Sequence, residues 1–450
     1  MYNSNQLANY IQTFTQAIRT KDCEKFKLCI TLNPGKEEAE IRSKFNEPNE
    51  IDLYDIKDDK ERFKPIISNH LKVIKSVYIT KSLDATFQNL NELILNLIRA
   101  SELESNWIMP ALISSFNELI QVYKVQEVRE PEDLDSIMES DMDFVGGNQT
   151  IKKSNLETLI NTLRKGFNLS FNDKNIDFSK SKRNDIYFFL GYLMKYCFKM
   201  RKNEFAKSML KVVKGAQQPL PNIKQSKSIE VKKYGIIYLY YQSLILLDDQ
   251  KYLESENLLK EALDVIYLNY KVKKCKQIQQ IYLIYLPLRL YNHGKLPSKQ
   301  VYKNYPILRI LYHDNIFKAI KQGNLNNFDN VVYKFRNILL KHHLYILTES
   351  LKQYIYLKLI KKVFQFTNEL EPPPDNKKSF SGFQLAIELS SLNEEQIKKI
   401  DFSNHNYNID TNEVECILAN LITKDRIRAY MSHSQKSIVF SKKIPFPAFG

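Results

Sequence analysis

Apolar side chains recur at helical spacing along most of the chain, and this pattern limits the fold more than any other feature. They lie three, four or seven residues apart, for example in residues 83–98 and 108–123, so that one face of a helix would carry them. No long stretch between residues 156 and 367 alternates with the period of two that a strand requires. The sequence therefore predicts long helices with buried apolar faces over most of its length.

The low glycine content supports this interpretation and argues against a nucleotide-binding enzyme. Only 11 of the 450 residues are glycine, whereas a typical protein has about 7%. The chain contains neither G-x-G-x-x-G nor G-x-x-x-x-G-K-[ST], whose glycines let backbone N–H groups approach a phosphate. We therefore expect no phosphate-binding glycine loop.

The histidines do not form a recognisable catalytic or metal site. The sequence lacks H-E-x-x-H. His342 and His343 are adjacent, so on a helix their side chains would point about 100° apart and could not share a metal from one face. His433 has no evident nucleophile beside it. We expect no catalytic residue, no metal, no cofactor and no small-molecule substrate, and hence no enzyme.

The cysteines and the apolar runs indicate in which cellular compartment the protein is expected. Five cysteines are widely spread without a C-x-x-C pair, which is typical of reduced, buried thiols in an intracellular protein. No signal-peptide pattern is visible at residues 1–12. The longest uncharged apolar run, residues 234–247, is shorter than the roughly 20 residues that span a bilayer. We expect no membrane association.

Changes in composition divide the chain into four regions. Residues 1–126 form an N-terminal helical region, and residues 127–154 form a linker or loop that is densely acidic and contains a glycine pair. Residues 155–370 form a region of helical repeats. Three consecutive prolines, which no helix can continue through, then separate the repeats from residues 371–450.

Two segments predict helical hairpins of the tetratricopeptide type. An aromatic helix is followed by the polar turn at residues 248–250 and by a second helix, in which Ala262 would let the two backbones approach closely. Gly323 and Asn324 end a helix and start the next one in the same way. The repeats are degenerate, so we infer a helical solenoid rather than a named repeat.

The last region predicts a winged helix. Short helices are expected at residues 379–391 and 393–400, and a third helix should start at Asp410, where Glu413 suggests a capping box. Alternation then begins at Ile427, and a turn at residues 434–436 leads into a second strand. Three helices followed by a β-hairpin belong to the helix-turn-helix group. The fold class is therefore an all-α solenoid that ends in a winged helix with a small hairpin.

The wing is basic and could contact a nucleic-acid backbone. The chain has a formal net charge of +15, which favours an anionic partner. The expected third helix carries Glu413 and Glu415 on its exposed face, so we predict phosphate binding without sequence readout. The alternative is that the wing packs on the solenoid or on a partner subunit. The predicted nucleic-acid-binding residues are Lys424, Arg426, Arg428, Lys436, Lys442 and Lys443.

A second basic region lies in the helical repeats. It would form a groove for a polyanion, and an acidic peptide and RNA are equally suitable guests. The predicted groove residues are Lys232, Lys233, Lys273, Lys274 and Lys276.

The C-terminal sequence resembles the PCI-domain family. Residues 412–422, NEVECILANLI, and residues 427–447, IRAYMSHSQKSIVFSKKIPFP, are similar to one branch of it. This branch contains PCI-domain-containing protein two, which is the PCI subunit of TREX-2, and the twelfth COP9 signalosome subunit of fungi. Asn412 and Ala429 replace an aspartate and a glycine of the family pattern. Weaker matches extend over roughly residues 155–450.

The resemblance implies a non-catalytic scaffold in the nucleus and cytoplasm. It implies pairing with another PCI-domain subunit, together with the small acidic disordered protein that the proteasome lid and TREX-2 share. It also implies RNA or DNA binding by the winged helix. Two assemblies remain open: a signalosome of the subunit-12 type, which removes the ubiquitin-like modifier from cullins, and a TREX-2-type complex that couples transcription to mRNA export.

Overall fold

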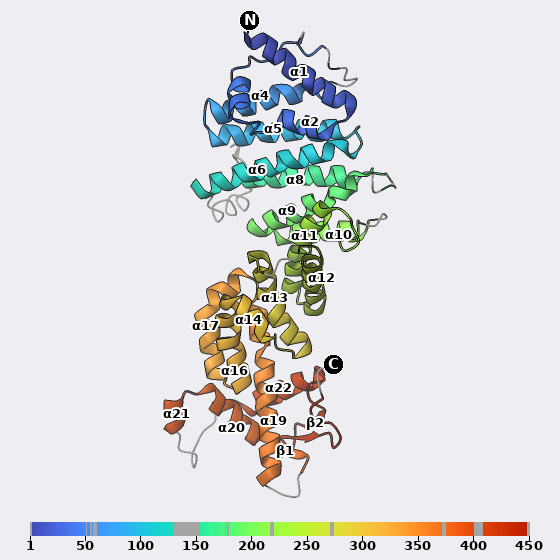
Figure 1. The fold of residues 1–450 in the computed structure, drawn as a ribbon. Coiled ribbons are helices and arrows are strands. Elements are labelled where there is room, and N and C mark those ends of the chain that lie inside the picture. Colours follow the sequence, from blue (N-terminus) through green and yellow to red (C-terminus); the bar gives the residue numbers. More distant parts are fainter. Residues whose placement is uncertain are drawn as a thin grey trace, which may run out of the picture. The chain divides into compact units, whose positions relative to one another are not determined.

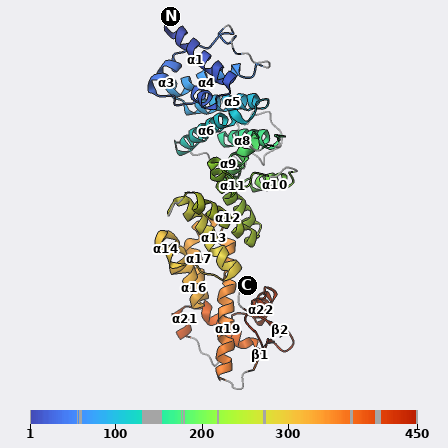
Figure 2. The same ribbon diagram turned by 45° about the vertical axis from the view of Figure 1, so that its right-hand side comes forward.

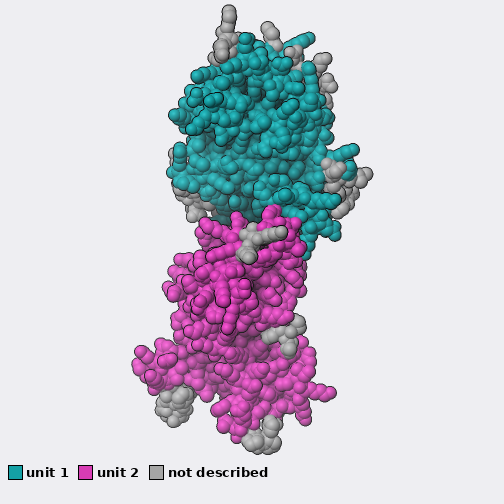
Figure 3. Space-filling model, viewed as in Figure 1, with its two compact units in different colours: residues 1–241 teal, residues 242–450 magenta. Residues whose placement is uncertain are grey.

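The protein is described in a computed structural model. The description covers residues 2–50, 52–54, 56, 61–129, 154–175, 177, 180–216, 220–270, 274–370, 375–399 and 408–447. The chain forms two compact units, residues 1–241 and 242–450, and the boundary falls within helix α11 (Ile229–Asp248) (Figure 3). None of the described helices is long and apolar enough to cross a membrane.

The first unit consists of helices in which neighbours in sequence pack against each other. Contacts join α4 to α5, α5 to both α6 and α8, and α8 to α9. The predicted stripe at residues 83–98 is the buried face of α5, and the stripe at 108–123 is that of α6. The helices are α1 (Tyr2–Thr20), α2 (Cys23–Ile30), α3 (Lys36–Ser43), α4 (Lys64–Tyr78), α5 (Leu83–Ser101), η1 (Asn106–Ile108), α6 (Met109–Arg129), α8 (Asn155–Phe171), η2 (Lys182–Asp185), α9 (Ile186–Lys199) and α10 (Asn203–Lys214).

The acidic linker predicted at residues 127–154 is described only at its ends. Helix α6 continues to Arg129, three residues past the predicted end of the N-terminal region, and residues 130–153 lie outside the described residues. Helices α5 and α8, on either side of this segment, pack against each other within one unit. The predicted division of the chain into four regions stays a prediction.

The second unit begins with helical hairpins and ends with a small sheet. Its helical part comprises α12 (Tyr252–Tyr270), α13 (Lys276–His293), α14 (Lys299–Asn304), α15 (Pro306–Leu308), the π-helix η3 (Arg309–Ile316), α16 (Phe317–Gln322), α17 (Leu325–Lys341), α18 (Tyr345–Ser350) and α19 (Lys352–Leu370). The winged helix follows, with β1 (Lys377–Ser379), α20 (Phe380–Ser391), α21 (Glu394–Lys398), α22 (Thr411–Thr423), β2 (Ala429–Ser432) and β3 (Ser437–Phe440).

Both predicted hairpin turns are present. Helix α11 ends at Asp248 and α12 starts at Tyr252, and Ala262 is fully buried. Gly323 adopts a left-handed φ of 74° at the end of α16, a conformation that favours glycine. The Asn324 side chain then caps α17 by accepting a hydrogen bond from the backbone of Asn327. The predicted class, helical repeats followed by a winged helix with a small hairpin, is confirmed.

The adjacent histidines are arranged differently from the prediction. Helix α17 ends at Lys341, so His342 and His343 lie beyond it, and His343 has a positive φ of 59°. The Nδ1 atom of His343 lies 2.9 Å from Oδ1 of Asp248, and this hydrogen bond raises the pKa of the imidazole. Among the described residues, no group of three His, Cys, Asp or Glu side chains could hold a metal ion.

The small sheet has three antiparallel strands in the order β1–β3–β2. The predicted hairpin is β2 and β3, with Ala429 opposite Phe440 and Ser432 opposite Ser437. The additional strand β1 pairs on the other side of β3, with Lys377 opposite Val439. The sequence analysis missed β1, because its three residues are too few to show an alternating pattern.

Candidate nucleic-acid interface

An aromatic cluster fixes the sheet of the winged helix to the helical repeats. The ring of Phe440, at the end of β3, lies 4.6 Å from that of Phe364 in α19 and 6.2 Å from that of Phe383 in α20. Phe446 completes the cluster at 5.5 Å from Phe440. Helix α22 contacts both α19 and α20 (Figure 1, Figure 2). The wing is therefore held on a rigid base, and the tail around Phe446 has a packing role.

Helix α22 has no positive charge with which to approach a nucleic acid. Its buried face is Val414, Leu418 and Leu421, and the helix contains no lysine or arginine. Asp410 is the N-cap residue as predicted, but its side chain makes no capping hydrogen bond to the helix. Glu413 is exposed. Because carboxylates and phosphates repel each other, α22 does not suit binding in a groove.

Two of the six predicted nucleic-acid-binding residues point toward the helical repeats. Arg426 donates through Nη2 to the carbonyl oxygen of Tyr291 at 3.3 Å, and its guanidinium lies 5.9 Å from the ring of Tyr354. Lys424 donates to the side-chain oxygen of Gln353 at 3.1 Å, and its ammonium lies 5.7 Å from the ring of Tyr291. For these two residues the structure supports the alternative interpretation, in which the wing packs on the solenoid.

Three others lie together at the open end of the hairpin. The backbone of Arg428 bonds to Ser441 and Pro445, so this residue lies beside the segment that carries Lys442 and Lys443. All three side chains are exposed. The Nε atom of Arg428 lies 3.3 Å from Oδ1 of Asp425. These three cations form a local positive surface, which we call the hairpin-base cluster.

The remaining predicted residue, Lys436, lies at the turn. It has a positive φ of 45° and donates to the side-chain oxygen of Asn412 at 3.1 Å. Glu415, which we predicted on the exposed face of α22, is half-buried and lies 2.7 Å from Nδ1 of His433 in the turn. Lys377 of β1 reaches the same turn through Gln435, at 2.9 Å. The turn is therefore tied to α22, apart from the hairpin-base cluster.

The predicted groove is divided between the two units. Lys232 and Lys233 belong to the first unit, and Lys274 and Lys276 belong to the second. Lys273 lies outside the described residues. The groove and its guest stay predictions.

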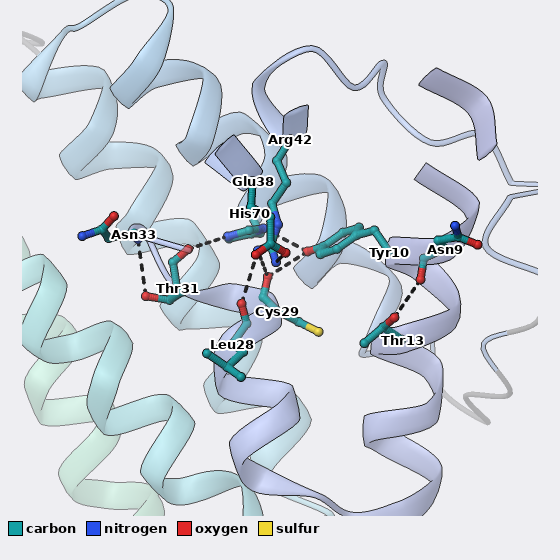
Figure 4. A network of polar contacts seen from close by, with 10 residues as sticks. All are labelled: Asn9, Tyr10, Thr13, Leu28, Cys29, Thr31, Asn33, Glu38, Arg42 and His70. Atoms are coloured by element: carbon teal, nitrogen blue, oxygen red, sulfur yellow. Dashed lines mark hydrogen bonds and ion pairs between the residues drawn. The ribbon is translucent and has the colours of Figure 1, made fainter. Parts of the chain in front are cut away.

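A second concentration of titratable groups lies in the first unit and was not predicted (Figure 4). It surrounds the C-terminal end of α2, where backbone carbonyls have no partner within the helix. Arg42 of α3 donates through Nη1 to the carbonyl oxygens of Cys29, at 2.9 Å, and Leu28, at 3.3 Å. Tyr10 of α1 donates to the same Cys29 carbonyl at 3.0 Å, and Glu38 pairs with Arg42. The cluster thus caps α2.

His70 of α4 completes this cap in its neutral form. Its Nε2 lies 3.1 Å from the carbonyl oxygen of Thr31, which can only accept, so Nε2 carries the proton. Its Nδ1 lies 2.9 Å from the hydroxyl of Tyr10. Full burial lowers the pKa of His70 to about 3. In this neutral form Nδ1 accepts, so the single hydroxyl proton of Tyr10 is shared between Nδ1 of His70 and the carbonyl of Cys29, and the buried imidazole stabilises the cap.

Helical repeats that end in a winged helix of this kind define a PCI-domain protein, and the family model of the PCI domain matches residues 332–442. The chain is 42% identical to the CSN12 homolog of Debaryomyces hansenii over 444 residues, which are 98% of both chains. It is 24% identical to Cop9 signalosome complex subunit 12 of Saccharomyces cerevisiae, over 66% of this chain and 70% of that protein. It is 25% identical to PCI domain-containing protein 2 of Danio rerio, over 65% of this chain and 64% of that protein. The chain belongs to the family of CSN12 homologs, as the resemblance of its C-terminal motifs implied.

Proposed function

We propose that this protein is a non-catalytic scaffold subunit of a PCI complex, of the COP9 signalosome subunit 12 type. The observation that carries the proposal is the 42% identity to a CSN12 homolog over 98% of both chains. The titratable cluster around His70 supports a scaffold, because it caps a helix. The complex would act in cullin deneddylation, in the nucleus and cytoplasm.

The partners of this subunit would be another PCI-domain protein and a small acidic disordered protein, the one common to the proteasome lid and TREX-2. Exposed apolar side chains of the second unit support a protein partner, since water disfavours them. Tyr430 is 68% exposed on β2, which is an edge strand and can pair with a further strand. Leu340 of α17 and Ile346 of α18 are 58% and 61% exposed.

The wing would bind RNA or DNA without sequence preference and link the complex to mRNA biogenesis. Within the predicted set, the exposed hairpin-base cluster of Arg428, Lys442 and Lys443 would make these contacts, together with Lys436 at the turn. Arg426 and Lys424 contact the repeats instead. Because α22 brings no cation, contacts to phosphates rather than to bases are expected.

A second candidate is a TREX-2-type subunit that couples transcription to nuclear mRNA export. The similarity to PCI domain-containing protein 2 over 65% of this chain favours it. The two candidates differ in their companions rather than in their surface chemistry.

Purification of the tagged protein from cells, followed by mass spectrometry, tests the proposal. Stoichiometric recovery of the subunits that remove the modifier from cullins is the expected result. Recovery of pore-tethering export subunits instead would support the second candidate. Peptidase activity that copurifies with the recombinant chain through every step would contradict a scaffold role.

A further inference from the structure

A small cavity in the second unit gathers cations around one aromatic wall. It has a volume of about 290 Å³ and is lined by Lys299, Tyr302 and Lys303 of α14 and by Arg309 and His313 of η3. Tyr302 is only 7% exposed, and its ring lies 5.1 Å from that of His313. The cavity lies outside the winged helix, and neither the helical periodicity nor any motif indicates it.

The π-helical turn orients Arg309 and His313 through one carboxylate. Asp314 lies with Oδ1 2.6 Å from Nδ1 of His313 and with Oδ2 3.3 Å from Nε of Arg309. Arg309 and Asp314 are five residues apart, which is the repeat of π-helical hydrogen bonding, and such turns are frequent at functional sites. Since the carboxylate only accepts, Nδ1 of His313 carries a proton. Asp314 therefore fixes the side chains on which the cavity depends.

The two lysines of the cavity have no partner in the part of the chain that the structure describes. Lys299 and Lys303 are four residues apart, so they project from one face of α14. Both are exposed, and neither makes a hydrogen bond or an ion pair with a described residue. Two lysines, an arginine and a histidine thus line the cavity, and Asp314, which contacts His313 and Arg309, is not among its lining residues. An anion would relieve their mutual repulsion.

We propose that this cavity binds the phosphomonoester of a phosphorylated serine or threonine in a partner protein. A phosphomonoester carries nearly two charges and accepts several hydrogen bonds, which the three cationic side chains of Lys299, Lys303 and Arg309 match. A nucleic-acid backbone spreads single charges along a track and would leave most of this set unused. Ile307 and Ile310, close to Arg309 in the chain, are 61% and 55% exposed, and we expect them to favour an apolar residue next to the phosphorylated one.

This site is independent of the hairpin-base cluster and goes beyond the scaffold role. A phosphate on a partner would add affinity at the repeats, so assembly could respond to phosphorylation. Failure of the wing to bind nucleic acid leaves the site unaffected, because the residues of the two sites do not overlap.

Fluorescence anisotropy with the full-length chain tests the proposal. The probes are a labelled degenerate peptide with a central phosphoserine next to leucine, and the same peptide with serine. The phosphorylated peptide is expected to bind at least about tenfold more tightly, as charge-assisted contacts predict. Equal affinity for the two peptides would overturn the proposal.

Paired variants separate the cavity from general charge. The double variant Lys303→Gln, Arg309→Gln should lose about tenfold or more of the phosphopeptide affinity. The matched control Lys295→Gln, Lys318→Gln removes two exposed cations outside the cavity and should lose less than about twofold. Equal losses of affinity in both double variants would mean that net charge alone explains the binding. This result would overturn the proposed phosphate site. Lys303→Gln alone, at an exposed side chain that bonds to no described residue, keeps the test valid if Arg309→Gln impairs folding.

Competition identifies the source of the phosphate. Inorganic phosphate should displace the phosphopeptide only at much higher concentration, because it lacks the apolar contact. An oligoribonucleotide with a 5′-phosphate should compete no better than the same oligoribonucleotide without it. If inorganic phosphate matches the peptide, or if the 5′-phosphate improves competition in an Arg309-dependent way, a phosphorylated protein is not the ligand.

Discussion

An arginine and a tyrosine cap the end of a helix in both units, but the two caps differ in burial. In the first unit, Arg42 and Tyr10 bond to carbonyls at the end of α2, and the guanidinium lies 4.9 Å from the tyrosine ring. In the second unit, Tyr354 donates to the carbonyls of Leu290 and Tyr291 at the end of α13, at 2.6 Å and 2.8 Å. Arg426 adds a bond to the latter carbonyl.

The difference between the two caps shows that the role of a basic residue in this chain depends on its burial. Arg42 is 4% exposed and lies with a buried histidine, so water cannot replace its hydrogen bonds. Arg426 is half-buried, at the junction of the winged helix with the repeats. Arg428, two residues further on, is exposed. Similar charges therefore range from a buried helix cap to an exposed surface, and stability measurements can rank them.

Arg42→Met should have the largest effect. It removes the Arg42 donor from the carbonyls of Leu28 and Cys29 in a buried site, where only Cys29 keeps the Tyr10 hydroxyl, and this costs about 3–5 kcal/mol. The loss is measured as reduced protection from hydrogen exchange in α2 and α3 and as a lower thermal midpoint. Lys44→Met, at an exposed neighbour, is the matched control and should stay close to wild type. Equal stability of the two variants would show that the cap is not important.

Acid should weaken the first cap next. His70 has a pKa of about 3 when folded, against an ordinary value of 6.5. Between these values the unfolded chain binds a proton that the folded chain does not, so stability falls as the pH decreases from about 6.5 toward 3. The slope is about 1.4 kcal/mol per pH unit.

Unfolding of the first unit by urea between pH 7 and 4.5 measures this slope. His70→Gln, which keeps a donor and an acceptor but cannot gain the proton, should flatten the dependence whatever its stability at pH 7. An unchanged slope in that variant would assign the acid sensitivity to other groups.

Arg426→Met should have a smaller effect, because its cap is only half-buried. We expect a loss of about 1–2 kcal/mol for one charged hydrogen bond. The loss should be confined to the junction, and hydrogen exchange at the end of α13 and the start of α19 measures it. Arg428→Met is the control on the neighbouring exposed arginine. If both arginines behave alike, the junction does not depend on the cap.

The sequence predicts the helices and the wing hairpin, because both depend on local periodicity and turns. Burial of the α5 stripe and the pairing of β2 with β3 follow from such patterns. The role of Arg426 could not be predicted, since its carbonyl partner lies 135 residues away in the chain. The three-residue strand β1 and the π-helix η3 also depend on contacts that leave no periodic signal.

The smallest effect on stability, and the largest on binding, is expected from the hairpin-base cluster. The triple variant Arg428→Glu, Lys442→Glu, Lys443→Glu should change stability by no more than about 0.5 kcal/mol, since the side chains are exposed. Its affinity for RNA and DNA of any sequence should fall. The log–log salt slope should become shallower by about 0.7–0.9 for each phosphate that the variant no longer neutralises.

A matched control separates this surface from the net charge of the chain. The triple variant Lys295→Glu, Lys318→Glu, Lys341→Glu reverses three exposed cations of the same unit outside the wing. It changes the net charge equally, so a long-range attraction would weaken by the same factor in both variants. A selective loss of nucleic-acid affinity in the hairpin-base variant, at unchanged stability, would show that the exposed cations bind nucleic acid, whereas the buried arginine caps a helix. Equal losses would remove the wing from the proposed function while leaving the two caps as they are.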